Sequence, residues 1–321
     1  MEGGFALWAN PSSPHAEGRR AKQALEDARA RIKAALGWDG EAIFTATASE
    51  AAAIAIGQGK RPLTCASAIE HDAVLRFAGP AQAWPVQPGS ALLAEPPEGS
   101  LDGLVAVQHA NSEVGVIQDA AAIRSAVDAG GGWWLADCAQ TAGKLALPPC
   151  DMAIVAAHKL GGPIGAAALL VRDYAMLEAS GGHERGYRRG TENLPAILGM
   201  AAALEADRGW LDEALALREW LDAQIAAHGG EVVAAHAPRL ATIASYRLPG
   251  MSATAQLIRL DGAGIAVSAG SACSSGTLRD SHVLSAMGHP HPGEVIRVSF
   301  GWSTTRADVE RFVQAWVGLA A

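Results

Sequence analysis

Short apolar segments alternate with Ala-rich helical segments through the first two thirds of the chain, and this alternation constrains the fold more than any other feature. The first helical segment, residues 15–36, has apolar positions at helical spacing and is followed by Gly37. Apolar strands that are connected by helices pair mainly in parallel and are covered on both faces. We therefore predict an α/β fold with a mainly parallel sheet flanked by helices. The predicted strands are residues 42–45, 103–108, 132–136, 152–155 and 166–171.

The pattern changes after residue 194. Long helices rich in Ala, Leu, Glu and Arg come first, and short strands then alternate with helices, which is typical of an α+β domain. The elements predicted there are helices over 194–227 with a break near 207–209, a strand at 242–248, a helix at 254–259, a strand at 295–300 and a helix at 306–318.

Two domains follow from this change of pattern. We assign residues 12–205 to a large α/β domain. We assign residues 206–321, together with residues 1–11, to a smaller α+β domain. Residues 80–99 are rich in Pro and Gly and are predicted to form a loop or an edge strand.

The composition excludes several classes of function. The chain has 25 Lys+Arg against 33 Asp+Glu, a formal charge of −8, and therefore no basic excess to neutralise nucleic-acid phosphates. No run reaches the roughly 18 apolar residues of a membrane span, and the N-terminus lacks the features of a secretory signal. The four cysteines form no C-x-x-C pair. We expect a cytoplasmic protein with free thiols, no bound metal, no membrane contact and no direct nucleic-acid binding.

One of the five lysines stands at the end of a predicted strand. Lys159 follows the apolar run 152–157 and His158, and it precedes the small-residue segment 160–163. Burial there would lower the pKa of the amine and free it as a nucleophile. Such lysines form Schiff bases with carbonyl substrates or with pyridoxal phosphate. A lysine that extends to the surface explains the position equally well.

Other polar residues stand where ligands are often bound. Asp137 is at the carboxyl end of a predicted strand, where open α/β sheets bind ligands, and Gln140 follows in the same turn. A buried carboxylate requires a cationic partner, which a protonated pyridinium nitrogen would supply. A helix cap is the simpler interpretation of Asp137. The same holds for His71, which precedes an apolar helix.

Two further residues are candidates in the C-terminal part. Cys273 lies in the small-residue run 269–276, and an exposed thiol in such a loop is a candidate nucleophile, whereas the other cysteines stand in apolar segments. Arg297 lies inside an apolar strand, where it could clamp a carboxylate through two parallel hydrogen bonds. Simple packing for Cys273 and an edge-strand ion pair for Arg297 are the ordinary alternatives.

Taken in order, these motifs resemble those of the cysteine desulfurases of the class V aminotransferase family. The resemblance is to the group with a long cysteine loop, which supplies sulfur for iron–sulfur clusters and thio-modified RNA. The segments that carry it span nearly the whole chain. They are NPSSPHAEGRRA (10–21), FTATASEAAAIAI (44–56), EHDAVL (70–75), NSEVGVIQD (111–119), DCAQTAGK (137–144), HKLGGPIG (158–165), HERGYRRGTEN (183–193), SAGSACSSGTL (268–278) and IRVSFG (296–301).

The resemblance implies the fold and the cofactor. The fold is that of type I enzymes dependent on pyridoxal 5′-phosphate (PLP), with a seven-stranded, mainly parallel sheet. Lys159 would hold PLP covalently, Asp137 would pair with its ring nitrogen, Gln140 would bond the ring hydroxyl, and His71 would stack on the ring. The remaining cofactor contacts implied by the family are Ala48 and Ser49 at a helix start, His158, Ser112, and Thr191 from the partner subunit of a homodimer.

The family's chemistry implies the substrate and the product. Arg297 and Asn111 would bind L-cysteine, with Arg297 clamping its carboxylate. Cys273 would attack the substrate sulfur, which leaves L-alanine and a persulfide on Cys273. Cys273, Lys159 and His71 are therefore the implied catalytic residues. The persulfide would pass to a sulfur-acceptor protein, either an iron–sulfur scaffold or a tRNA-thiolation protein.

The chain departs from the family pattern in several places. The family's opening strand has no counterpart before Asn10, and Ala156 stands where a phosphate-binding serine is usual. Ser112 replaces the second asparagine of an Asn-Asn-Glu segment, and the region between residues 71 and 111 is shorter than usual. We therefore expect a compact, divergent member of the family with weaker cofactor affinity.

Two other functions remain open. One is another class V PLP enzyme, such as a selenocysteine lyase or an aminotransferase, although the presence of Cys273 argues against the aminotransferase. The other is a cofactor-poor homologue that acts as a scaffold or regulatory subunit. The joint presence of Lys159, Asp137, His71, Cys273 and Arg297 argues against the scaffold.

Overall fold

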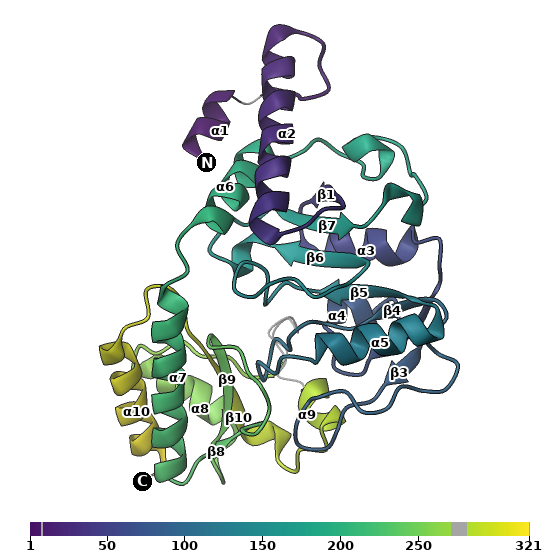
Figure 1. Cartoon of the computed structure of the whole chain (residues 1–321). Coiled ribbons are helices and arrows are strands. Elements are labelled where there is room, and N and C mark those ends of the chain that lie inside the picture. Colours follow the sequence, from purple (N-terminus) through teal and green to yellow (C-terminus); the bar gives the residue numbers. More distant parts are fainter. Residues whose placement is uncertain (8, 271–280, 321) are drawn as a thin grey trace. The chain divides into compact units, whose positions relative to one another are not determined.

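The structure is a computed structural model that describes residues 1–7, 9–270 and 281–320 of the chain. It divides into two compact units (Figure 1). No helix in the described part of the chain combines the length and the apolarity needed to cross a membrane. Unit 1 comprises Met1–Ala83, Pro96–His109 and Asp119–Ala206, and unit 2 comprises Trp84–Glu95, Ala110–Gln118 and Asp207–Ala321.

A seven-stranded sheet forms the centre of unit 1. Its strand order is β1-β7-β6-β5-β4-β2-β3. The pairs β2–β4, β4–β5 and β5–β6 are parallel, whereas β7 runs antiparallel to both β6 and β1. The prediction of a mainly parallel, seven-stranded α/β sheet is confirmed. The strands are β1 (Glu41–Thr45), β2 (Leu63–Ser67), β3 (Gln82–Trp84), β4 (Leu104–Ala106), β5 (Trp133–Asp137), β6 (Met152–Ala156) and β7 (Ala167–Val171).

Helices pack against this sheet and against one another (Figure 1). Helix α3 packs across β1, β6 and β7, and α5 packs against β5. The Ala, Leu and Ile positions predicted for the buried face of α2 are buried, and α2 packs on α6. Gly37 ends α2 in the left-handed region at φ 63°, as the sequence predicts. The helices of unit 1 are α1 (Glu2–Leu7), α2 (Ala16–Leu36), α3 (Ala48–Gly57), α4 (Asp72–Leu75), α5 (Ala120–Gly130) and α6 (Leu194–Glu205).

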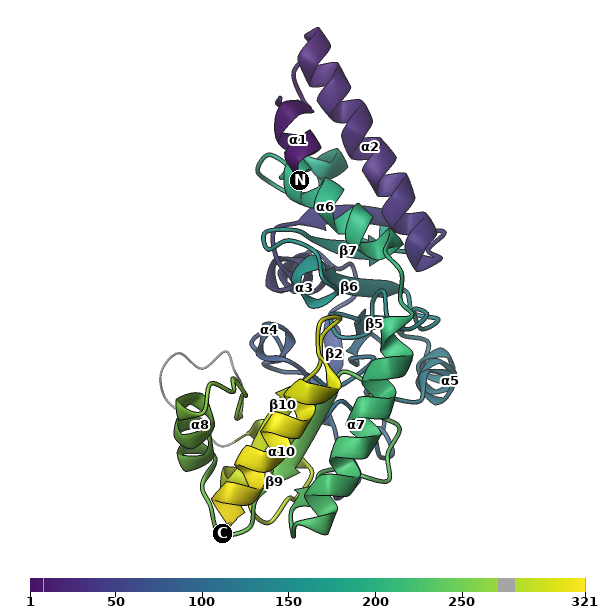
Figure 2. The same cartoon turned by 90° about the vertical axis from the view of Figure 1, so that its left-hand side faces the viewer.

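Unit 2 has its own sheet and its own core. The sheet is three-stranded and antiparallel in the order β10-β9-β8. Helices α7 and α10 contact each other and lie side by side in Figure 2. Trp316 and Tyr246 are fully buried in this core. The elements are α7 (Trp210–Ala227), β8 (Glu231–Val232), β9 (Ile243–Arg247), α8 (Ala253–Gly262), α9 (His282–Ala286), β10 (Val295–Ser299) and α10 (Arg306–Ala320).

The two units differ from the predicted domains at the edges. Residues 1–11 belong to unit 1 and not to the smaller unit, because α1 packs on α6 and α2. The close approach of Gly4 to Pro195 leaves no room there for a larger side chain. The chain also contributes Trp84–Glu95 and Ala110–Gln118 to unit 2, two segments that lie far before residue 206.

The buried carboxylate of Asp151 lies directly before β6, near the amino-terminal ends of β5 and β6. It connects α5, β5 and the residue that follows β7. One oxygen of Asp151 accepts hydrogen bonds from the Trp134 N–H at 2.7 Å and from Arg124 at 2.9 Å. Its second oxygen pairs with Arg172 at 2.7 Å. The Asp151 side chain is only 2% exposed, so its charge depends on these partners for stabilisation.

Replacing Asp151 by Asn should therefore destabilise the fold strongly. The substitution leaves Arg124 with a neutral partner in a buried place, and we expect a loss of about 3 kcal/mol in the free energy of unfolding by urea. Asp128 is a matched control, because it pairs with the same Arg124 at 2.7 Å but is 66% exposed. Asp128→Asn should cost less than about 1 kcal/mol. Equal losses for the two variants would contradict the account.

Candidate functional site

The register of the sheet brings two chain segments to one edge. Thr45 at the end of β1 and Ala156 at the end of β6 both pair with Ala167 of β7, one on each side. Because β7 is antiparallel to both neighbours, β1 and β6 run in the same direction. The residues that follow β1 and β6 therefore leave the sheet at the same edge and at the same level, one on each side of β7. This edge is also where the parallel strands β5, β4 and β2 end.

The start of α3 stands at this edge. Thr47 caps the helix, because its hydroxyl oxygen accepts a hydrogen bond from Glu50 N at 3.0 Å. The Glu50 carboxylate in turn accepts one from Ala46 N at 2.6 Å, which completes a capping box. Ala48 and Ser49 are the first two helical residues, whose N–H groups have no acceptor within a helix. A helix start of this kind attracts an anion such as a phosphate.

Lys159 and His158 follow β6 at the same edge. They lie in a short 3₁₀ turn, η1 (Ala157–Lys159), that carries both side chains beyond the buried strand, and both are exposed. Of the two open interpretations of Lys159, the exposure of its side chain agrees with the one in which it extends to the surface. The pKa of His158 is lowered, first by desolvation and then by the positive charge of Lys159. At neutral pH this imidazole is therefore mostly uncharged.

Asp137 is the last residue of β5, next to β6. Its carboxylate is half-buried, and desolvation raises its pKa. The hydrogen bond from Ala139 N at 2.8 Å opposes that rise, as do the electrostatic interactions of Asp137 with His71 and Lys159. The carboxylate is thus desolvated and lies within electrostatic range of an imidazole and an amine.

His71 and Gln140 have local hydrogen bonds of their own. His71 caps α4, with its Nδ1 atom accepting from Ala73 N at 3.1 Å. That bond puts the proton of the neutral imidazole on Nε2. The Gln140 carbonyl accepts from the Lys144 amine at 2.9 Å. The helix-cap interpretation of His71 is confirmed, and a cap does not exclude stacking of the ring on a ligand.

A carboxyl group that the sequence did not single out lies among these residues. Glu70 is 1% exposed and accepts a hydrogen bond from Gln108 N. Its pKa is raised well above the usual range, first by desolvation and then by the negative charge of Asp137. The signal for Glu70 in the sequence is its position directly before His71, the predicted site residue.

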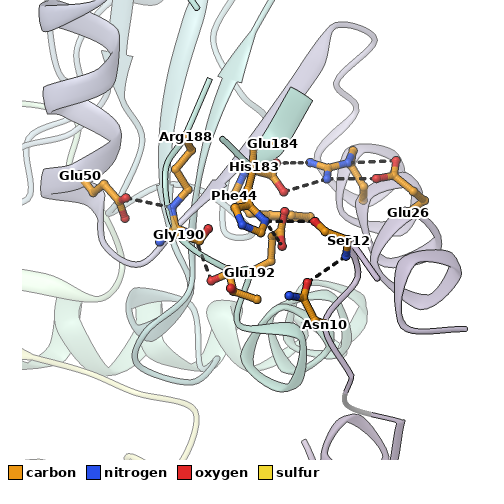
Figure 3. Close-up of polar contacts among 12 residues, drawn as sticks. Asn10, Ser12, Glu26, Phe44, Glu50, His183, Glu184, Arg188, Gly190 and Glu192 are labelled. Carbon is orange, nitrogen blue, oxygen red and sulfur yellow. Dashed lines mark hydrogen bonds and ion pairs between the residues drawn. The ribbon is translucent and has the colours of Figure 1, made fainter. Parts of the chain in front are cut away.

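Thr191 lies in the segment between β7 and α6. Its side chain is exposed. Its carbonyl accepts a hydrogen bond from Arg188 at 3.3 Å. Figure 3 shows the neighbouring residues of this segment, including His183, Glu184, Arg188 and Glu192.

The remaining predicted residues belong to unit 2. Arg297 on β10 donates a hydrogen bond to the Ser112 carbonyl at 2.8 Å, so the structure brings these two residues together. Asn111 is fully buried, and its side-chain oxygen accepts from Glu113 N at 2.9 Å and from Val114 N at 3.0 Å. That oxygen therefore stabilises its own turn. Cys273 lies outside the described residues.

The unit 1 residues form a donor set that fits PLP. An accessible amine at Lys159 suits the aldehyde of PLP, and the desolvated carboxylate of Asp137 suits a protonated ring nitrogen. The start of α3 suits the phosphate. Ala156, which stands in place of the family's serine, is 1% exposed and supplies no hydroxyl.

Comparison with known proteins agrees with this geometry. The family described as aminotransferase class-V matches residues 6–312. The chain belongs to the class V aminotransferase family. Within it, the chain is 33% identical to a cysteine desulfurase of Gluconacetobacter diazotrophicus, over 98% of this chain and 87% of that protein. It is 31% identical to cysteine desulfurase IscS 1 of Archaeoglobus fulgidus, over 97% and 90% of the two chains.

Solved structures of the same class V fold are also similar to this chain. A NifS-like protein from Rickettsia africae has a TM-score of 0.87 at 27% identity, with 99% of this chain and 94% of that chain covered. DndA from Streptomyces lividans has a TM-score of 0.75 at 30% identity, with 92% of each chain covered. These similarities extend over both units, so the class V resemblance inferred from the motifs is confirmed.

Three cysteines of this class V chain are free and buried. Desolvation raises the pKa of all three thiols, well above the usual range for Cys138 and to about 12 for Cys150. A thiol attacks only as the thiolate, and for Cys150, whose pKa lies about four units above pH 8, the thiolate fraction at that pH is about one in ten thousand. Cys65, Cys138 and Cys150 are therefore poor nucleophiles, as the sequence predicted.

Counting the reactive thiols tests whether Cys65, Cys138 and Cys150 are unreactive in the folded protein. In a Cys273→Ser variant, which removes the one other cysteine, no thiol of the folded protein should react with a disulfide reagent within minutes at pH 8. Unfolding in denaturant should then expose three. Fast reaction of any thiol in the folded variant would show that the described cysteines are more accessible than the structure indicates.

Proposed function

We propose that this chain is a PLP-dependent cysteine desulfurase that converts L-cysteine to L-alanine and leaves a persulfide on Cys273. One observation carries the proposal. The amine of Lys159, the carboxylate of Asp137 and the start of α3 lie at one edge of the sheet, in a chain with 33% identity to a protein named cysteine desulfurase.

The cofactor contacts follow from this arrangement. Lys159 would hold PLP covalently, and Asp137 would bond its ring nitrogen. Ala48 and Ser49 would bind the phosphate through their N–H groups, with help from His158. Bound PLP supplies an electron sink for the bonding electrons released at the substrate's α-carbon. Gln140 and His71 would contact the ring from the neighbouring turns, and Ser112 would be a further contact.

The residues of the chain account for the proton and sulfur transfers. The exposed Lys159 amine would move a proton at the substrate's α-carbon. The Cys273 thiolate attacks the substrate sulfur, so that an S–S bond forms as the C–S bond breaks. The β-carbon takes up a proton and is reduced, and the two sulfurs of the persulfide are oxidised in return. His71, with its proton on Nε2, is the proposed donor for that proton transfer.

Arg297 and Asn111 are the proposed substrate contacts in unit 2. The hydrogen bond from Arg297 to the Ser112 carbonyl fixes the guanidinium on the turn that follows Asn111. A guanidinium held in this way is suited to clamp a substrate carboxylate. The Asn111 side-chain oxygen is engaged by its own turn, which leaves the amide nitrogen as the group for substrate.

The proposal also includes partners and location. The enzyme would act as a homodimer in which Thr191 of each copy completes the phosphate site of the other. The persulfide would pass to an iron–sulfur scaffold or a tRNA-thiolation protein. We place the enzyme in the cytoplasm, where thiols such as the three free cysteines stay reduced.

Incubation with L-cysteine tests the function. Wild type should form alanine and a protein-bound persulfide, and Cys273→Ala should lose the persulfide and at least about a hundredfold in alanine formation because the sulfur has no acceptor. The variant should still bind PLP. Cys65→Ala is the matched control, since that thiol is buried and should not matter for turnover.

Three outcomes would contradict the proposal. Unchanged turnover in Cys273→Ala would indicate an aminotransferase. Strong preference for selenocysteine would indicate a selenocysteine lyase. A preparation that stays colourless with added PLP would indicate a scaffold.

A further inference from the structure

The segment of residues 183–193, here called the Thr191 segment, is anchored at its start by a buried ion pair. Glu184 is 5% exposed, and its carboxylate pairs with Arg29 of α2 at 2.7 and 3.0 Å. The same carboxylate accepts a hydrogen bond from Phe44 N on β1 at 2.9 Å (Figure 3). These contacts hold Glu184 against α2 and β1 of unit 1. The backbone of Glu184 has a positive φ of 48°.

A second contact holds the other end of the segment. Arg188 donates from Nε to the Glu50 carboxylate of α3 at 2.9 Å. Its Nη1 atom donates to the carbonyls of Gly190 at 2.9 Å and Thr191 at 3.3 Å. A single guanidinium is therefore bonded at once to the start of α3 and to the backbone of Thr191, as Figure 3 shows for Glu50, Arg188 and Gly190.

The two oxygens of the Glu50 carboxylate accept hydrogen bonds from different donors. One oxygen accepts from Ala46 N and so closes the capping box of α3, and the other accepts from Arg188. The ion pair is partly shielded from water, with the Arg188 side chain 12% exposed and that of Glu50 31% exposed. A charge-assisted bond in such a place is stronger and more directional than one at the open surface.

We propose that Arg188 is a positioning residue that couples the phosphate-binding turn of α3 to Thr191. A change in the position of either group is transmitted to the other through one rigid, planar guanidinium. The inference rests on the proposed function, in which Ala48 and Ser49 bind the phosphate of one copy and Thr191 reaches the phosphate of the other. Filling one cofactor site then places Thr191 for the second, so the two sites of the dimer bind PLP cooperatively.

Arg188→Gln and its neighbour Arg189→Gln form a matched pair for the test. Arg189 is exposed, and within the described part of the chain its guanidinium donates to the Ser180 carbonyl at 3.2 and 3.4 Å. The readout is the release of PLP from the holoenzyme at equilibrium, followed by absorbance. We expect Arg188→Gln to raise the dissociation constant about tenfold, as the loss of a charge-assisted bond does, and Arg189→Gln to change it less than about twofold.

Two further measurements distinguish a positioning role of Arg188 from simple stabilisation of the fold. They are the cooperativity of PLP binding and the effect of Glu50→Gln. Wild type should bind PLP with a Hill coefficient above one and Arg188→Gln with a coefficient of about one. Glu50→Gln should reproduce the effect, because its oxygen can still cap Ala46 while its amide N–H groups face Arg188. The double variant should be no worse than either single one, since both remove the same contact.

The outcomes distinguish this inference from the function on which it rests. If wild type binds PLP without cooperativity, or if Arg188→Gln binds it as tightly as Arg189→Gln, the coupling is refuted and the desulfurase proposal stands. Additive losses in the double variant refute it as well. If Arg188→Gln fails to fold, Glu50→Gln decides by the same criteria. If wild type binds no PLP at all, both proposals fail together.

Discussion

The register of β7 between β1 and β6 is the constraint on which the rest of unit 1 depends. Ala167 pairs with Thr45 on one side and with Ala156 on the other, so two segments more than a hundred residues apart end in one row. A slip by one residue on either side would turn every side chain of that strand to the opposite face. The start of α3 and Lys159 would then no longer leave the sheet together, and the donor set proposed for the cofactor would be lost.

Electrostatics explains why this edge suits a cationic ring. Glu70 and Asp137 are two carboxyl groups whose pKa values are raised by desolvation, and the negative charge of Asp137 adds to the rise for Glu70. His71 and Lys159 interact electrostatically with Asp137 and oppose the rise of its pKa. A ligand that brings a protonated nitrogen to Asp137 lowers the electrostatic cost of the carboxylate. The same contact would stabilise the protonated form of the ligand.

The sequence predicted the strands and helices whose apolar positions are regular, and it missed contacts that depend on distant partners. β6 and β7 were predicted because their residues are apolar throughout, whereas β2 has the same length but contains the polar residues Thr64 and Ser67. The ion pair of Glu184 with Arg29 was not predicted, because the two residues lie 155 positions apart in the sequence. The exposure of Lys159 was one of two open interpretations, since the length of the turn after β6 cannot be deduced from composition.

The central claim is that Lys159 is the amine that carries the cofactor. The direct measurement is reduction of the PLP-loaded protein with borohydride, followed by protease digestion and mass spectrometry of the peptides. Reduction makes the bond permanent, and the account predicts one pyridoxyl group, on the peptide that contains Lys159. A pyridoxyl group on Lys144 or on another lysine, with the Lys159 peptide unmodified, would contradict the account.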